Sequence, residues 1–422
     1  MLLILISLYE IIDISTSNNA LQFIELLLSS QGYRIWTTIL NYDVYELSTN
    51  VVFLLNSSMY SPNDKLQDII DYFFESDILT KQIIPLLQRE STFTNANNEH
   101  RNNRQCDLVN SSLCLFGVLI TNRGTNHEHK SINYKNEEII IYTIIDIFLK
   151  YISIENESYL RYIFYGLSQL ESLHTDIYFE YFAGKTNIID VLINPKFQTP
   201  EYSKVIFYGH RAIGNLFGGI EINKYYTKDY IVKLFEHFAL YLNSKTFIIK
   251  KESAWVISNM VVDCDDIVKI AIDNDILMKA LVKYFDNETD QSLIYEGILV
   301  VQILITKADF NRFFRIMEFG FFNIIMNLLK VDFFTDFVKA NLFLCVFNCL
   351  KRGEVIAEQI GGNKILEKFL EMEGKEIVLK YINTDDRELK KILEEIEGKY
   401  LNEYCGIGEN ESFKGMNNHL VI

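Results

Sequence analysis

Three residue types at helical spacing could do chemistry in the middle of the chain. In the segment KKESAWVISNM, Glu252, Trp255 and Asn259 are three and four residues apart, so an α-helix would carry all three on one face. An indole face attracts Lys and Arg side chains, a carboxylate pairs with their charges, and a carboxamide donates to and accepts from a peptide main chain. This combination predicts binding of an extended basic peptide.

Amide side chains recur at a nearly constant interval. Asn215, in RAIGNLFGG, and Asn259, in AWVISNMVVDC, lie 44 residues apart; a further step reaches Gln302, and a step back reaches Gln169. Asn56, in VVFLLNSS, belongs to the same series near the N-terminus. A period in the forties is typical of armadillo and HEAT repeats, whose units of two or three helices stack because none buries its apolar face alone. We therefore expect amides from successive helices to clamp a peptide main chain.

The elements that must position these side chains are helices. Apolar residues at the spacing of a helical face fill 69–87, 275–285 and 364–382, and the 422 residues include only 4 prolines and 19 glycines. The sequence predicts an all-α fold, a right-handed armadillo-repeat superhelical solenoid of about eight to nine repeats. Stacking would turn one face of each repeat into an acidic concave groove.

Polar or irregular stretches interrupt the helical pattern. Residues 91–105 and 122–134 are polar and predict inserted loops, while 405–422 lacks periodicity and predicts a flexible tail. The apolar stretch 1–14 lacks the basic start and the small-residue cleavage site of a signal peptide, and it is too short to span a bilayer. We expect a single solenoid domain over 1–404, without a membrane partner.

Charge and cysteine content narrow the class of partner. The formal net charge is −16, which disfavours direct binding of nucleic acid and favours a cationic partner. Six cysteines without a paired framework indicate a reducing compartment. Cys345 and Cys349 share a helical face but lack further ligands, and His127 and His129 lie in a polar stretch, so neither a metal nor a cofactor is expected.

Three segments, in order along the chain, resemble the importin-alpha (karyopherin alpha) family of armadillo-repeat proteins. SAWVISNMVV at 253–262, preceded by Glu252, is similar to the family's inner-helix signature Glu-x-x-Trp-x-x-x-Asn. RAIGNLFGGIE at 211–221 resembles a family variant with Arg in place of the tryptophan. KRGEVIAEQIGGNKILEKFL at 351–370 resembles the terminal repeat. The resemblance is good from roughly residue 200 onwards and faint before residue 170.

The resemblance implies binding of nuclear-localisation signals, the basic peptide segments of cargo proteins, for nuclear import. Positions of the family's minor site, extended by Glu296 and Gln302 from the repeat pattern, give the candidate residues Arg211, Asn215, Gly219, Glu221, Glu252, Trp255, Ser258, Asn259, Glu296 and Gln302. The major site is weaker, with Asn56, Tyr165 and Gln169 as candidates. The resemblance further implies importin-beta-type and export receptors as partners, and residence in cytoplasm and nucleus.

The first part of the chain departs from the family pattern. Arg34 is the only basic residue before Lys65, so the basic importin-beta-binding segment is missing, and Tyr60 stands where the family has a lysine-binding aspartate. Either the sequence is truncated, or the protein works without that segment. We expect peptide binding to be biased towards the groove over 200–302.

Other interpretations of these residues remain open. Trp255 by itself suits a hydrophobic core, Arg211 could pair with a neighbouring acid, and Trp36 fits a core position. The sequence has no GxSxG, P-loop, HExxH or Rossmann glycine pattern, so an enzyme is not expected. An armadillo scaffold or assembly protein with a different partner is the alternative to the import adaptor.

Overall fold

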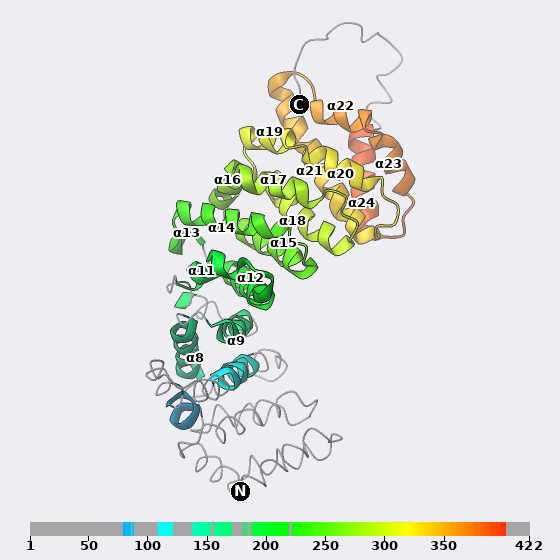
Figure 1. Ribbon diagram of the computed structural model, residues 1–422. Coiled ribbons are helices and arrows are strands. Elements are labelled where there is room, and N and C mark those ends of the chain that lie inside the picture. The colour runs from blue at the N-terminus through cyan, green and yellow to red at the C-terminus, as the bar shows by residue number, and fades with distance from the viewer. Residues whose placement is uncertain are drawn as a thin grey trace, which may run out of the picture. The chain divides into compact units, whose positions relative to one another are not determined.

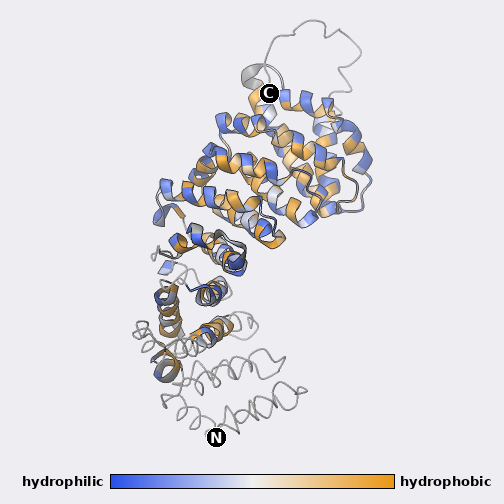
Figure 2. Cartoon of the chain, in the orientation of Figure 1, coloured by the Kyte–Doolittle hydropathy of each residue, from blue (hydrophilic) through white to orange (hydrophobic). Residues whose placement is uncertain are grey.

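The structure, a computed structural model, is predominantly helical over the described residues. It describes residues 79–85, 87, 109–120, 137–152, 156–170, 180–181, 183, 187–218 and 222–401, and these ranges contain no strand (Figure 1). The chain divides into two compact units, Met1–Ile220 and Glu221–Ile422. In both units hydrophobic and hydrophilic residues share the same helices (Figure 2). This distribution is expected where one face of each helix is buried.

The second unit is built from helices in sets of three. Within each set, the third helix packs against the third helix of the next set. The sets are α13 (Ile222–Tyr225), α14 (Lys228–Leu242) and α15 (Phe247–Val262); α16 (Asp265–Asp273), α17 (Asp275–Tyr284) and α18 (Gln291–Lys307); α19 (Phe310–Glu318), α20 (Phe321–Leu329) and α21 (Asp336–Ile360); and α22 (Lys364–Glu371), α23 (Gly374–Tyr381) and α24 (Arg387–Ile396), which the π-helix η5 (Glu397–Leu401) follows. A stacked three-helix repeat is the armadillo arrangement, so the fold is an all-α solenoid.

Hydrogen bonds between neighbouring sets reflect the length of the repeat. Gln291 Oε1 accepts a hydrogen bond from the Thr335 backbone N–H at 2.8 Å, across 44 residues. Arg315 Nε donates to the Ile272 carbonyl at 3.0 Å, across 43 residues. Each repeat therefore fixes the next through polar contacts at its edges as well as through its apolar core.

Local sequence sets where the helices begin and end. Asn274, between α16 and α17, accepts from the Leu277 backbone N–H through its side chain, and such a cap stabilises a helix by about 1 kcal/mol. At the far end of α21, Gly361 has a left-handed conformation (φ 75°), which lets its N–H reach the Ala357 carbonyl at 2.9 Å. Glycine adopts this conformation without the steric cost that other residues incur, so Gly361 ends the helix.

The described part of the first unit contains helices of the same kind. Helix α9 (Glu157–Ser168) packs against α8 (Glu137–Ile152) and α12 (Ser203–Gly218), and residues 109–120 form a further helix. Shorter elements are η1 (Leu79–Ile83), α11 (Asn187–Leu192), η3 (Pro195–Gln198) and η4 (Pro200–Tyr202). A Cβ added to Gly117 would lie 3.3 Å from the Gly166 Cα, so glycine permits the helix over 109–120 to approach α9 this closely.

The predicted helices can be compared with the structure over the described ranges. The helix predicted over 275–285 is α17, with Phe285 as its C-cap. Residues 364–382 form two helices, α22 and α23, rather than one, because Glu373 between them adopts a left-handed conformation (φ 67°). The predicted loops over 91–105 and 122–134, the tail and the first 78 residues lie outside the described residues. The helices that are described include none with the length and apolar character of a membrane span.

Candidate functional site

Five helices share one pattern of burial that places the candidate residues in register. In α15, the acid Glu252 and the aromatic Trp255 are separated by two buried residues, and the amide Asn259 follows four residues after Trp255. Two buried residues also separate the corresponding positions in α9, α12, α18 and α21. The acid position holds Tyr162, Tyr208, Glu252, Glu296 and Asn341. The aromatic position holds Tyr165, Arg211, Trp255, Leu299 and Leu344. The amide position holds Gln169, Asn215, Asn259, Ile303 and Asn348.

Helix α15 presents its aromatic and amide side chains at the surface. Trp255 and Asn259 are both half-buried, so the indole is not enclosed in the core as its structural alternative would require. Ser258 is buried, and its hydroxyl donates to the Trp255 carbonyl at 2.7 Å. Ser258 therefore satisfies its hydrogen bond within the helix, whereas Trp255 and Asn259 offer surface to a ligand.

Two carboxylates from neighbouring helices flank this surface. Glu252 on α15 is 7% exposed, and Glu296 on α18 is 9% exposed. Burial raises the pKa of Glu296 above its ordinary value of 4.5, and the charge of Glu252 raises it further, while Lys251 opposes both effects. Lys251 Nζ lies 3.8 Å from Glu296 Oε1, a weak ion pair at the surface. The arrangement concentrates negative charge beside an aromatic ring, which suits a cationic side chain.

The register of α18 differs from the one expected from the sequence. A count from amide to amide selects Gln302, but the burial pattern aligns Gln302 with Ser258 and places Ile303 at the amide position. The Gln302 Oε1 atom is buried and has no hydrogen-bond partner in the structure. The expected main-chain clamp therefore does not continue from α15 into α18, where the aromatic and amide positions carry Leu299 and Ile303.

In the first unit, both of the described candidate amides donate hydrogen bonds to Ser168 at the end of α9. Asn215 on α12 is buried, and its Nδ2 donates to the Ser168 carbonyl at 2.7 Å. Gln169 caps α9, and its Nε2 donates to the Ser168 Oγ at 3.0 Å. Arg211 is exposed on α12. Neither amide points its donor towards a ligand, and the candidates Gly219, Glu221 and Asn56 lie outside the described residues.

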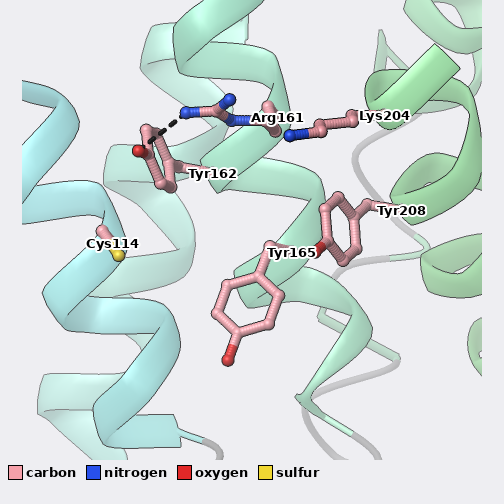
Figure 3. Close-up of a pocket in the computed structure, with 6 residues that line it drawn as sticks. All are labelled: Cys114, Arg161, Tyr162, Tyr165, Lys204 and Tyr208. Carbon is pink, nitrogen blue, oxygen red and sulfur yellow. Dashed lines mark hydrogen bonds between the residues drawn. The ribbon is translucent and has the colours of Figure 1, made fainter. Parts of the chain in front are cut away.

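A cavity of about 420 Å³ opens over α9 and α12 in the first unit. Its lining residues, drawn in Figure 3, are Cys114, Arg161, Tyr162, Tyr165, Lys204 and Tyr208. The Tyr165 and Tyr208 rings meet edge to face, with centroids 5.4 Å apart. This cavity includes the candidate Tyr165, but its charged groups are cations, which would repel a basic peptide.

Sequence reasoning missed this cavity because its members come from three separate helices. The helix over 109–120 contributes Cys114, α9 contributes Arg161, and α12 contributes Lys204. A signal was present, because Tyr162 and Tyr208 recur at the repeat interval and occupy the acid position without being acids. Without the register of the helices, the sequence does not show that these tyrosines stand where other repeats have an acid.

The structure does not place Cys345 and Cys349 in a reactive or metal-binding site. Cys345 and Cys349 lie fully buried in α21, and burial raises the pKa of both thiols, so they stay protonated. No cluster of His, Cys, Asp or Glu suited to a metal ion occurs among the residues that the structure describes. The pair His127 and His129 lies outside them.

Comparison with known proteins concerns the fold alone. No protein-family model and no curated protein matches the sequence. The structure is similar to the crystal structure of an engineered protein, with a TM-score of 0.56 and 14% identity over 92% of each chain. The structure is also similar to a designed armadillo repeat protein in complex with the peptide (KR)4, with a TM-score of 0.47 and 17% identity. The match covers 58% of this chain and 95% of the designed protein. Only the first of these two exceeds one half, and its identity is too low to indicate more than a shared solenoid.

Proposed function

We propose that this protein is a non-enzymatic adaptor that binds extended basic peptides on the face formed by α15 and α18. The observation that carries the proposal is the half-buried Trp255 one helical turn from the largely buried Glu252, with a second largely buried carboxylate, Glu296, at the matching position of the adjacent third helix. The indole can cover the aliphatic stem of a Lys or Arg, and the carboxylates can pair with its charge.

The energetics favour a cationic side chain at this face over a neutral one. A cation on an indole face gains about 0.5–2 kcal/mol. Glu296 has only a distant contact with Lys251, at 3.8 Å, so an incoming guanidinium or ammonium group could pair with its carboxylate more closely. Asn259, one helical turn beyond Trp255, supplies a carboxamide that can bind the main chain of the same peptide.

The physiological role that we propose is nuclear import of proteins with basic nuclear-localisation signals. The ordered resemblance of 211–221, 253–262 and 351–370 to the importin-alpha family supports this role. It would place the protein in the cytoplasm and nucleus and would bring importin-beta-type and export receptors as further partners. The three-helix repeat supports the scaffold on which such binding depends.

The test is peptide binding measured by fluorescence anisotropy. A labelled lysine-rich peptide should bind with an affinity that falls as salt is added, and a scrambled neutral peptide should not bind. The double substitution Trp255→Ala with Asn259→Ala should weaken binding about thirtyfold or more, because it removes a cation–π contact and an amide. Phe310→Ala, which removes an exposed ring from α19 in the same unit, is the matched control and should leave affinity unchanged. Equal affinity of the double variant and the wild type would remove the proposal.

The alternative function is an armadillo scaffold for a partner of different chemistry. The observation that favours it is the apolar pair in α18, where Leu299 and Ile303 replace an aromatic and an amide. Such a face would bind an apolar side chain of a partner rather than form hydrogen bonds with its main chain. Binding that resists salt and ignores Glu252→Gln would support this alternative over the adaptor.

A further inference from the structure

The cavity of the first unit combines two cations with three tyrosines. Arg161 projects from α9, and Lys204 reaches towards it from α12 (Figure 3). The remaining walls are the rings of Tyr162, Tyr165 and Tyr208 and the side chain of Cys114. None of the described residues that line the cavity is an acid. Its volume, about 420 Å³, lies in the range of sites that bind small ligands or the side chains of a peptide.

Among the residues that the structure describes, no carboxylate neutralises the positive charge in this cavity. No ion pair joins Arg161 or Lys204 to a carboxylate within the described ranges. The described acids nearest to them in sequence are Glu157, one turn before Arg161 on α9, and Glu201 in η4, and neither forms an ion pair with them. Arg161 is half-buried and Lys204 is exposed, so both cations are accessible from solvent. Two accessible cations that face one cavity without a described carboxylate suit an anionic ligand.

The hydrogen bonding of the cavity leaves donors for such a ligand. Arg161 Nη2 donates to the Tyr162 hydroxyl at 2.7 Å, and the guanidinium carbon lies 4.5 Å from the centre of the Tyr162 ring. This contact uses one N–H of the guanidinium fork and leaves the others available. Because the Tyr162 oxygen accepts from Arg161, its own O–H can donate elsewhere, and it becomes a better donor beside a cation.

The position of the cavity on the repeat indicates the shape of the ligand. Tyr162 and Tyr208 hold the acid position of α9 and α12, and Tyr165 holds the aromatic position of α9. Successive repeats present these positions at regular intervals, which suits an extended chain better than a compact molecule. The net charge of −16 on the whole chain opposes any polyanion, and the repulsion is larger for the continuous phosphate backbone of a nucleic acid than for a short acidic peptide.

We propose that the cavity lined by Arg161, Tyr162, Lys204 and Tyr208 binds an extended acidic peptide through its anionic oxygens. The anionic oxygens come from clustered Asp and Glu carboxylates or from a phosphorylated side chain, and both present the same chemistry to this donor set. The proposal is independent of basic-peptide binding by the second unit, because it uses none of the same residues.

The experiment is anisotropy with the full chain and labelled peptides: polyglutamate, polyglutamine of the same length, and a peptide containing phosphotyrosine. Polyglutamate or the phosphopeptide should bind in a salt-dependent manner, and polyglutamine should not. Arg161→Gln and Lys204→Gln should each weaken binding about tenfold. Lys150→Gln, which removes an exposed cation from α8 in the same unit, should leave binding unchanged.

The milder substitution Tyr208→Phe keeps the ring and removes one donor, so it should weaken binding a few-fold without unfolding the site. Thermal unfolding followed by circular dichroism checks that each variant remains folded. A preference for the phosphopeptide would assign the oxygens to phosphate, and a preference for polyglutamate would assign them to carboxylates. The proposal is overturned if neither peptide binds, if Lys150→Gln weakens binding as much as Arg161→Gln, or if only a single-stranded oligonucleotide binds. Lysine-rich peptide binding should persist in all these variants, which separates this site from the proposed adaptor function.

Discussion

The two units carry different side chains at the acid positions of the repeat, and different charges near those positions. In the second unit, the acid positions of α15 and α18 hold Glu252 and Glu296, and Trp255 follows Glu252 by one helical turn. In the first unit, the acid positions of α9 and α12 hold tyrosines, and the cations Arg161 and Lys204 line the same cavity. The repeat therefore fixes where the side chains lie on the surface. The residues at and near those positions decide the charge of each surface.

The largest expected effect comes from neutralising the acid positions of the second unit. The double variant Glu252→Gln with Glu296→Gln keeps side-chain size and should weaken binding of a lysine-rich peptide about a hundredfold, because two charge-assisted contacts are lost. Binding of polyglutamate should stay within about twofold, since the first unit is untouched. Glu318→Gln, which removes an exposed charge from α19, is the control for net charge. A parallel loss in the control would show that only the overall field matters.

Disturbing the packing of the first unit should produce the next largest effect. A Cβ at Gly117 would lie 2.8 Å from the Tyr165 ring, so Gly117→Ala must displace that ring from the cavity wall. We expect about tenfold weaker polyglutamate binding and a loss of about 1–3 kcal/mol in the free energy of unfolding. Affinity for the lysine-rich peptide should not change. Chemical denaturation and anisotropy on the same preparation measure both quantities, and unchanged polyglutamate binding would show that Tyr165 is not part of the site.

Acidification should weaken binding of a lysine-rich peptide to the second unit by a smaller factor. Glu296 has a pKa raised by burial, so it gains a proton at a higher pH than an exposed glutamate as the solution is acidified. Affinity for a lysine-rich peptide should therefore fall about fivefold as the pH drops through that raised pKa, while the lysines of the peptide stay charged. In Glu296→Gln the same titration should be flatter. Identical pH profiles for the two proteins would assign the binding to other groups.

The smallest expected effect is an increase in affinity for a lysine-rich peptide. Lys251 weakly compensates Glu296 at 3.8 Å, so Lys251→Gln should strengthen binding of a lysine-rich peptide about threefold. Lys269→Gln, which removes an exposed lysine paired with Asp266 in α16, is the matched control and should have no such effect. Calorimetric titration resolves a difference of this size. Weaker binding in Lys251→Gln would mean that the lysine contacts the peptide rather than competing with it.

Much of the fold could be predicted from the sequence because it depends on local patterns. The helix over 275–285 and the helix end at Gly361 follow from apolar spacing and from the conformational freedom of glycine. The amide interval of 44 residues gave the repeat length before any helix was placed. The break within 364–382 was missed, because Glu373 in a left-handed conformation leaves no mark on the apolar pattern.

The candidate site was only partly accessible to the same reasoning. Glu252, Trp255 and Asn259 lie within two turns of one helix, so their shared face follows from helical geometry alone. Counting between repeats was less reliable, because a shift of one residue rotates a side chain by about 100° around a helix. That rotation separates Gln302 from Ile303, and the burial pattern was needed to choose between them.

The sequence by itself determined the helices, the length of the repeat and the aromatic–amide–acid face of α15. Tertiary structure decided the register of the neighbouring helices, the inward use of Asn215 against Ser168, and the meeting of Arg161 and Lys204 in one cavity. The physical reason is the separation along the sequence of the residues that determine each property. Helix formation depends on residues a few positions apart, whereas the charge of a shared surface depends on residues that only packing brings together.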